Sequence, residues 1–307
     1  MPETAPDKAE VIFARHRARI FAVAYRLTGT VSDAEDVVQE TWLRWSGIDV
    51  SDIRSPEAWL TTAAGRLGLD HLRRSKARRE TYVGPWLPEP IVEAASDMHQ
   101  PTPEENISLA DDISMALLHM LERLAPEERA AFLLHEAFDY DYGELSTLLG
   151  KSEAACRQIV SRARRRVTDE RPRFNANLRD HKRLAAAFSD ALAREDPKAL
   201  LSCFREDAVL YSDGGGKAAA ALNPLHTADH IARFFTGIQK KYALPLDPIL
   251  ITVNGGPGFA LLHEGQMHSI MSLDIKDGQI ATIYMIRNPD KLARASKVLG
   301  VPLYPAG

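Results

Sequence analysis

The stretch YGELSTLLGKSEAACRQIVSRARRRV, residues 142–167, predicts two short helices joined by a tight turn at Gly150-Lys151-Ser152. Ser152 is a good N-cap for the second helix, and Glu153 complements the positive end of its dipole. On a helical wheel, the second helix carries one apolar stripe, formed by Cys156, Ile159, Val160, Ala163 and Val167. This pattern is typical of a helix-turn-helix whose second helix packs by that stripe.

The opposite side of the second helix is polar and rich in arginine. A helix of this kind can lie in the major groove of DNA, where arginine and glutamine reach base edges and phosphates. The alternative is an ordinary helical hairpin with a solvated basic face. The glycine turn, the cap and the one-sided arginines favour DNA binding, through Lys151, Ser152, Arg157, Gln158, Ser161, Arg162, Arg164 and Arg165.

The composition bounds the rest of the chain. A length of 307 residues predicts two or three domains, and a net charge of −4 restricts any DNA contact to local basic patches. The two cysteines, Cys156 and Cys203, exclude a disulfide framework and fit a reducing cytosol. No apolar run approaches the roughly 18–20 residues of a membrane span. We therefore expect a cytoplasmic protein with no membrane partner.

The first helical domain, residues 7–82, contains an acidic helix face. Ser32 and Glu35 form the pattern of a capping box, which predicts a helix start at Ser32. The outward side of this helix carries a leucine among acidic and amide groups, at Asp33, Asp36, Gln39, Glu40 and Leu43. A solvated face is one interpretation, and a docking surface for a basic partner is the other.

The next helix starts at Ser55-Pro56-Glu57 and becomes basic towards its end. Such a helix can follow a phosphate backbone. Trp42 and Trp59 lie on apolar stripes, which favours core packing over stacking on unpaired bases. The charged residues expected at a DNA surface are Arg66, Asp70, Arg73, Arg74, Lys76, Arg78 and Arg79.

A proline-rich linker, residues 83–102, separates this domain from a second helical domain, residues 103–172, which ends in the helix-turn-helix. Inside the linker, the segment WLPEP places a tryptophan and a leucine where a simple spacer needs neither. We expect this segment to dock, through Trp86, Leu87, Pro88, Glu89 and Pro90.

Up to this point the sequence resembles the extracytoplasmic-function sigma factors of bacterial RNA polymerase. The resemblance rests on YRLTGTVSDAEDVVQETWLRW (25–45), SPEAWLTTAAGRLGLDHLRR (55–74) and the helix-turn-helix. It implies that the acidic face of residues 33–43 grips the clamp helices of the largest polymerase subunit. It also implies that the basic helix opens and reads the −10 element, and that the helix-turn-helix reads the −35 element of promoter DNA.

In this family a base is flipped from the melted strand into a pocket near a helix start. The loop Asp49–Ser55 is the matching segment here. The chain departs from the family at Gly65-Arg66, where many members carry Arg-Asn.

The third domain, residues 178–307, alternates helical and strand patterns, with Asp277-Gly278 as a hairpin turn. Helices followed by a curved antiparallel sheet resemble the SnoaL-like, NTF2-type cone fold. The predicted fold class is therefore multidomain, with two all-α domains and one α+β domain. His263 and His268 differ by an odd number, so on one strand they would point to opposite faces and could not share a metal. We expect no catalytic residue, cofactor or metal, and whether a small ligand occupies the cone stays open.

Three motifs narrow the resemblance to the SigJ-type group, in which a SnoaL-like domain is fused to the sigma factor. They are WLPEP, DGGGK (Asp213, Gly214, Gly215, Gly216, Lys217) and NPDKL, which begins Asn288, Pro289, Asp290, Lys291. The resemblance implies that the extension modulates sigma activity in cis, in place of a separate anti-sigma factor. We expect the three segments to contact one another; the alternative is that the last two are turns required by the cone fold.

Two other functions remain as alternatives. One is a DNA-binding regulator whose C-terminal cone senses a small ligand, and the other is a SnoaL-like enzyme fused to a DNA-binding module. Leu43 within the acidic face argues against the regulator, which needs no polymerase-docking surface.

Overall fold

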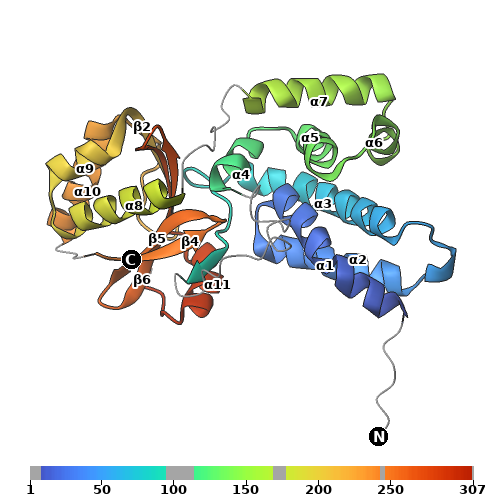
Figure 1. Ribbon diagram of the computed structural model, residues 1–307, viewed down its shortest axis with the longest axis horizontal. Helices are drawn as coiled ribbons and strands as arrows, with labels where there is room; N and C mark the ends of the chain where they lie inside the picture. The colour runs from blue at the N-terminus through green and yellow to red at the C-terminus, as the bar shows by residue number, and fades with distance from the viewer. Residues whose placement is uncertain (1–7, 95–113, 169–177, 243–245, 306–307) are drawn as a thin grey trace, which may run out of the picture. The chain divides into compact units, whose positions relative to one another are not determined.

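The computed structural model describes residues 8–94, 114–168, 178–242 and 246–305 (Figure 1). The chain divides into two compact units, one made of residues 1–80 with 118–171 and the other of residues 81–117 with 172–307. Both helical regions thus fall in the first unit, and the linker belongs to the second. Within the described residues, no helix has both the length and the apolar character that a bilayer span requires.

The first unit is helical. Its elements are α1 (Lys8–Thr28), α2 (Val31–Ser46), η1 (Val50–Asp52), α3 (Pro56–Glu80), α5 (Pro126–Phe138), α6 (Tyr142–Leu149) and α7 (Glu153–Thr168). The boundary between the units falls within α4 (Met115–Leu121). α1, α2 and α3 pack around apolar side chains that are fully buried, among them Ile20, Leu27, Trp45 and Leu60.

The start of α2 differs from the prediction. Thr30, not Ser32, is the N-cap, and its side chain accepts a hydrogen bond from the Asp33 amide at 3.1 Å. Gly29 has a φ of 74° and ends α1, so the chain leaves one helix and enters the next within two residues. Ser32 therefore lies inside the first turn, where it is exposed.

The helix-turn-helix prediction is confirmed by α6 and α7. Gly150 closes α6 in the left-handed conformation, with φ of 64° and ψ of 35°. Ser152 accepts a hydrogen bond from the Ala155 amide at 3.3 Å, as expected of a cap. Along α7 the predicted apolar stripe is buried, Cys156 and Ala163 completely.

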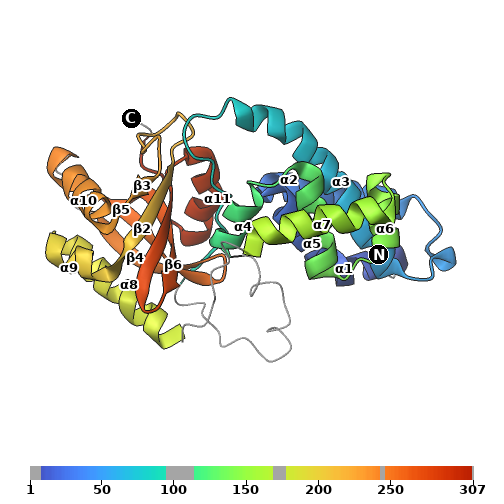
Figure 2. The same ribbon diagram turned by 90° about the horizontal axis from the view of Figure 1, so that it is seen from above.

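The second unit is built on one seven-stranded sheet in the order β1-β4-β5-β6-β7-β2-β3. The strands are β1 (Val92–Ala94), β2 (Phe204–Asp213), β3 (Leu225–His226), β4 (Asp247–Val253), β5 (Gly256–His263), β6 (Gln266–Lys276) and β7 (Gln279–Ile286). The helices are α8 (Leu178–Ala193), α9 (Pro197–Cys203), α10 (Ala228–Tyr242) and α11 (Pro289–Leu299). Figure 2 shows α8, α9 and α10 on one side of the sheet and α11 on the other.

Two features of this sheet differ from the prediction. It is mixed rather than antiparallel, because β2 pairs in parallel with β7, with Leu210 opposite Ile283. The chain between these strands passes through α10 and four further strands, which gives the long crossover that parallel pairing requires. The linker also contributes a strand, β1, which pairs antiparallel with β4.

The side of the sheet under α8 and α10 is filled by aromatic side chains. The Phe188 ring contacts Phe204, Phe235 and Phe259, with centroids 5.7, 5.8 and 5.8 Å away. All four side chains are at most 2% exposed. Aromatic packing of this kind stabilises the helices against the sheet.

The two histidines do not lie on opposite faces. His263 ends β5 and His268 lies on β6, and both rings contact Tyr304, with centroids 5.2 and 5.8 Å away. The predicted opposite orientation applies to two residues of one strand, whereas a hairpin turn separates His263 from His268. Burial, followed by the charges of Arg287 and His263, lowers the pKa of His268 to about 3. Among the residues that the structure places, no three His, Cys, Asp or Glu side chains gather as metal ligands would.

Candidate nucleic-acid interface and linker clamp

The predicted docking face on α2 combines acidic groups with one prominent leucine. Asp36 and Gln39 are exposed, whereas Asp33 and Glu40 are half-buried. Leu43 is 62% exposed. Glu40 accepts a hydrogen bond from Arg44 at 2.7 Å, which holds its carboxylate near the helix surface. An exposed leucine surrounded by acids suits a partner that is basic and apolar together.

A cavity of about 510 Å³ opens at the start of α3. Four residues of the predicted base-pocket loop line it, together with α2 and α3 side chains; the full lining is Arg44, Asp52, Ile53, Arg54, Ser55, Ala58, Trp59, Thr62, Ala63 and Arg66. Trp59 is half-buried and packs against Trp45, with centroids 5.3 Å apart. The Trp59 side chain therefore packs against the core and also lines the cavity.

The basic residues of α3 differ in exposure along the helix. The exposed predicted residues are Arg66, Asp70, Arg73, Arg74 and Lys76. The Arg79 side chain is only 17% exposed and donates to Glu122 and to the Thr28 carbonyl. Burial lowers the pKa of Arg79 against the opposing effect of Glu122. The Arg78 side chain lies outside the described residues, and among those described the last exposed basic residue of the predicted set is Lys76.

The polar side of α7 is exposed as predicted, at Arg157, Gln158, Ser161, Arg162, Arg164 and Arg165. Several of its basic groups already pair with carboxylates. Lys151 lies 3.2 Å from Glu127, and Arg162 lies 3.8 Å from Glu128. Arg164 donates to Glu136. A phosphate group approaching this face would replace carboxylates as the partner of these cations.

A second cavity, of about 350 Å³, lies between α5 and the helix-turn-helix. Lys151, Gln158 and Arg162 line it together with Glu127 and Glu128. Arg166, which was not predicted, is exposed and lies 2.7 Å from Glu128. Its spacing of four residues from Arg162 could have placed it on the same face.

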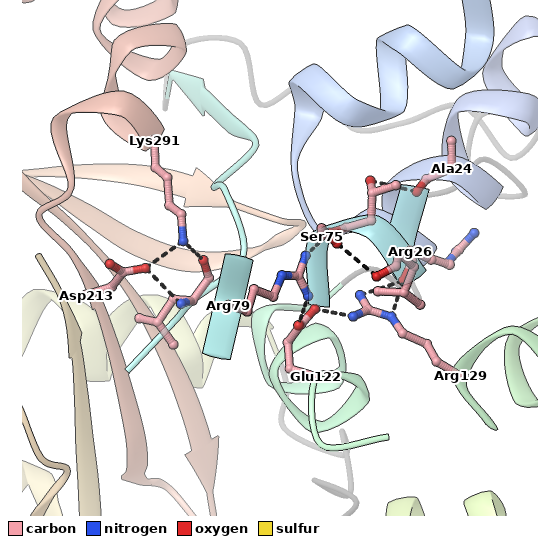
Figure 3. Close-up of polar contacts among 11 residues, drawn as sticks. Ala24, Arg26, Ser75, Arg79, Glu122, Arg129, Asp213 and Lys291 are labelled. Carbon is pink, nitrogen blue, oxygen red and sulfur yellow. Dashed lines mark hydrogen bonds and ion pairs between the residues drawn. The ribbon is translucent and has the colours of Figure 1, made fainter. Parts of the chain in front are cut away.

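In the second unit, the linker is fastened by a buried aspartate. Asp213 is fully buried, and its Oδ2 accepts hydrogen bonds from the Leu87 amide at 2.8 Å and Lys291 Nζ at 2.7 Å (Figure 3). Its Oδ1 accepts one from the Tyr82 hydroxyl at 2.6 Å. We call Tyr82, Leu87, Asp213, Asn288 and Lys291 the linker clamp.

The other members of the linker clamp complete the network. Lys291 also donates to the Leu87 carbonyl and lies 4.0 Å from the centre of the Trp86 ring. Asn288 donates to the Tyr82 hydroxyl at 2.8 Å. Burial, followed by the Asp213 charge, raises the pKa of Tyr82. Tyr82 was not predicted, although an aromatic residue just before Gly84-Pro85 is a usable signal.

The glycines of DGGGK are needed where the segments meet. Gly215 has a φ of 59°, and a Cβ there would come within 2.4 Å of Asn288 Nδ2. A Cβ on Gly214 would meet the Ala218 carbonyl oxygen at 2.2 Å. At the end of the motif, Lys217 forms an exposed ion pair with Asp290. WLPEP, DGGGK and NPDKL thus contact one another directly.

The clamped linker shares a core with the start of α4. Leu87 and Val92 pack in one buried cluster with Met115, Ala116 and residues of β4 to β7 and α11. Residues 87 and 115 are therefore held by the same face of the sheet. The chain that joins the two helical regions is pinned near both of its ends.

Comparisons with known proteins agree with this division. Residues 12–78 match the family described as Sigma-70 region 2, and residues 114–167 match Sigma-70, region 4. The chain is 38% identical over 286 residues to the ECF RNA polymerase sigma factor SigJ of Mycobacterium tuberculosis, covering 90% of each chain. It is 28% identical over 296 residues to the probable ECF RNA polymerase sigma factor SigI of that species, covering 96% of this chain and 98% of SigI.

A solved structure is also similar along most of the chain. The crystal structure of M. tuberculosis SigJ superimposes with a TM-score of 0.72 at 35% identity, covering 92% of this chain and 97% of that one. The similarity therefore includes the sheet domain as well as the helical regions.

Proposed function

Because the chain belongs to the extracytoplasmic-function sigma factors of RNA polymerase, we propose that it directs the core enzyme to specific promoters and initiates transcription there. The observation that carries this proposal is the presence of three surfaces in one chain. These are the acidic face with Leu43, the cavity beside the basic face of α3, and the exposed polar face of α7. Together they offer one surface for binding a polymerase and one for each of two separate DNA elements.

We assign docking on the polymerase to the acidic face of α2 that includes Leu43. Leu43 supplies apolar area, worth about 25 cal/mol per Å² removed from water. Asp36 and Gln39 supply charge and hydrogen-bonding groups exposed beside it. The partner proposed is the clamp-helix surface of the largest polymerase subunit.

We assign the promoter contacts to the other two surfaces. We assign the −10 element to the exposed part of α3 and to the cavity lined by Trp59 and Arg66, which suits an unstacked base. The −35 element is assigned to the polar face of α7, where Arg157, Gln158 and Arg162 can enter a major groove. Binding energy, without a covalent step, supplies the work of opening the DNA.

Control in cis is assigned to the sheet domain. The linker clamp and the shared core hold residues 87 and 115 on one sheet. The distance that region 4 can travel from region 2 is then set by this domain rather than by the length of the linker. A separate anti-sigma factor is not needed for such control, and a ligand in the domain is not part of the proposal.

The first test uses two leucines that are equally exposed, at 62%. Leu43→Lys should abolish promoter-specific transcription with core polymerase and weaken binding to the core. Leu222→Lys, in the sheet domain, should retain both. Equal loss or equal retention in the two variants would contradict the docking assignment.

The second test compares the full chain, a chain ending near residue 177 and Lys217→Ala in the same transcription assay. Specific initiation by any of them supports the sigma function, and differences among them give the sign of control in cis. If none initiates while the full chain binds duplex DNA alone, the ligand-sensing regulator is the better description.

A further inference from the structure

An aromatic ring lies beside one arginine of the proposed −35 surface. The Tyr142 ring, at the start of α6, is half-buried, and Arg157 Cζ lies over it at 5.1 Å from the ring centre. A guanidinium in this position is attracted to the negative face of the ring. Arg162, Arg164 and Arg166 of the same helix pair with carboxylates of α5. Arg157 thus has a kind of partner that differs from an acid.

The Tyr142 ring is itself held in a defined place. Asp141 accepts a hydrogen bond from the Glu144 amide at 2.8 Å, and the Glu144 carboxylate accepts one from the Asp141 amide at 2.9 Å, a capping box that fixes the first turn of α6. The His135 ring of α5 packs against Tyr142, with centroids 4.6 Å apart. His135 Nδ1 lies 2.7 Å from the Tyr140 carbonyl oxygen, which can only accept, so this nitrogen donates. The Tyr142 ring therefore connects α5 with α7.

The second partner of Arg157 is an acid on its own helix. Glu153 accepts a hydrogen bond from Arg157 Nη2 at 2.6 Å, and the two side chains are 52% and 53% exposed. The carboxylate occupies N–H groups that DNA would also use, whereas a ring attracts the cation without accepting those groups in the same way. Tyr142 can therefore keep its contact while Arg157 binds DNA, and Glu153 must give up its own.

Arg157 lies where a recognition helix contacts bases. It is one turn after Glu153, the first residue of α7, and in a helix-turn-helix the N-terminal residues of the second helix reach base edges. The arginine fork matches the two acceptors of guanine, O6 and N7, in the major groove. An exposed arginine gives up side-chain rotamers in order to bind, and a side chain already held by a ring has fewer to lose.

We propose that Tyr142 is a positioning residue for −35 recognition, because it holds the Arg157 guanidinium in the orientation in which it reads a guanine base. This inference rests on the proposed function, since it concerns how the same surface of α7 distinguishes promoters. Arg157 makes the base contact, and Tyr142 acts through Arg157.

The test compares variants of the full chain, bound to core polymerase, on one promoter whose −35 bases are randomised. The transcripts from each sequence give the base preference of each variant at every position. Arg157→Ala should lower the preference for guanine at one position about fivefold to hundredfold. If Arg157→Ala instead weakens binding to all sequences equally and reduces the slope of log affinity against log salt by about one, the contact is to a phosphate, which would overturn the proposal.

Two substitutions at Tyr142 separate the aromatic face from the size of the side chain. Tyr142→Phe keeps the ring, whereas Tyr142→Leu keeps an apolar side chain without it. Tyr142→Leu should lower the preference for the same guanine about twofold to fivefold, and Tyr142→Phe should leave it unchanged. Thermal unfolding shows whether each variant folds, and Tyr142→Met replaces Tyr142→Leu if the latter does not. Equal preferences in the Phe and Leu variants would contradict the role of the ring.

A double-mutant cycle tests whether Tyr142 acts through Arg157. In the Arg157→Ala background, Tyr142→Leu should cause no further change in base preference. A further loss of the same size would show that Tyr142 acts only through the packing of region 4, and would overturn the proposal. Glu153→Gln, which removes the other partner of Arg157, is the control and should not lower the preference. A loss as large as that of Tyr142→Leu would assign the positioning to Glu153 instead.

Binding of duplex DNA by the full chain alone separates the two proposals. If the unmodified chain directs no initiation with core polymerase, the proposed function fails. The variants are then compared on randomised duplexes bound by the full chain alone, where the same losses of guanine preference are expected. If the full chain binds no duplex either, both proposals fail. If initiation is specific and Tyr142→Leu has the base preference of the unmodified chain, the role of Tyr142 alone fails.

Discussion

Glu127 forms exposed ion pairs with Arg73 and Lys151, which we call the Glu127 bridge. The linker clamp and the Glu127 bridge use the same chemistry in opposite surroundings. Each places one carboxylate between basic groups from distant parts of the sequence. Asp213 and Lys291 are 0% and 8% exposed, whereas Glu127 and Lys151 are both 36% exposed. Separating the buried pair would leave a charge without water, and separating the exposed pair would not. Burial, rather than the type of ion pair, decides whether water can replace the partner of each charge.

This difference assigns separate tasks to the two networks. The linker clamp makes residues 82–94 a fixed part of the sheet domain. The Glu127 bridge and the Arg129 contacts join α5 to α3 and α1 within the first unit. The predictions below test how burial changes the contribution of charged groups to stability.

Asp213→Ala should have the largest effect. It leaves Lys291 and the Leu87 amide without their acceptor in a buried site, which should cost about 3–5 kcal/mol of unfolding free energy for the sheet domain. Asp290→Ala is the control, because it removes only an exposed pair with Lys217, and should cost less than about 1 kcal/mol. Denaturant unfolding measures both. Equally small losses in the two variants would show that the buried contacts of Asp213 contribute no more to stability than an exposed ion pair does.

Arg129→Leu should come next. It removes the donors to the Arg26 carbonyl and to Glu122, at about 1.5–3 kcal/mol for hydrogen bonds with a charged partner. Arg129→Lys should not restore the loss, since an ammonium group cannot reproduce the fork of donors. Thermal unfolding measures the effect. Full rescue by lysine would mean that charge alone holds the regions together.

A buried basic group without an acid partner should make the sheet domain acid-sensitive. The pKa of His268 is lowered to about 3, against about 6.5 in an unfolded chain. Below pH 6.5 the unfolded state therefore gains a proton that the folded state does not. The free energy of unfolding therefore decreases as the pH drops below 6.5, by about 2 kcal/mol at pH 5. Above pH 6.5 this contribution is constant.

His268→Gln tests this prediction, with the exposed His226→Gln as control. Unfolding free energy between pH 7 and pH 5 should decline less steeply in the first variant and as in the unmodified chain in the second. A slope unchanged by His268→Gln would assign the acid sensitivity to other groups.

Salt should produce the smallest effect. Raising the ionic strength from 0.1 to 1 M shortens the Debye length from about 10 to about 3 Å. The unfolding free energy of the first unit, which contains the exposed Glu127 bridge, should then fall by less than about 1 kcal/mol, while that of the sheet domain should show no comparable loss. If salt lowered the stability of the first unit and of the sheet domain equally, burial would not explain the difference between the two networks.

Local patterns allowed a good part of this structure to be predicted. The turn at Gly150, the cap at Ser152 and the hairpin at Asp277-Gly278 depend on neighbouring residues, and all three are present. The contact among WLPEP, DGGGK and NPDKL came from resemblance, since residues 87 and 213 are far apart in the sequence. The surfaces assigned to polymerase and DNA stay predictions.

What could not be predicted depends on long-range partners. Arg129 reaches a carbonyl 103 residues away, and nothing near it distinguishes it from a solvated helix arginine. The strand β1 is three residues long, too short for an alternating pattern. Arg79 seemed equivalent to its exposed neighbours, although Glu122 draws it inward. In each case tertiary packing decided between alternatives that the local sequence left equal.

Hydrogen exchange at the Leu87 amide tests the central difference most directly. This amide donates to the buried Asp213 carboxylate. It should exchange slowly in the free full chain and equally slowly in the complex with core polymerase and promoter DNA, because the linker clamp is buried and stays closed. Rapid exchange at Leu87 on promoter binding would show that the linker clamp itself opens, and would contradict the account.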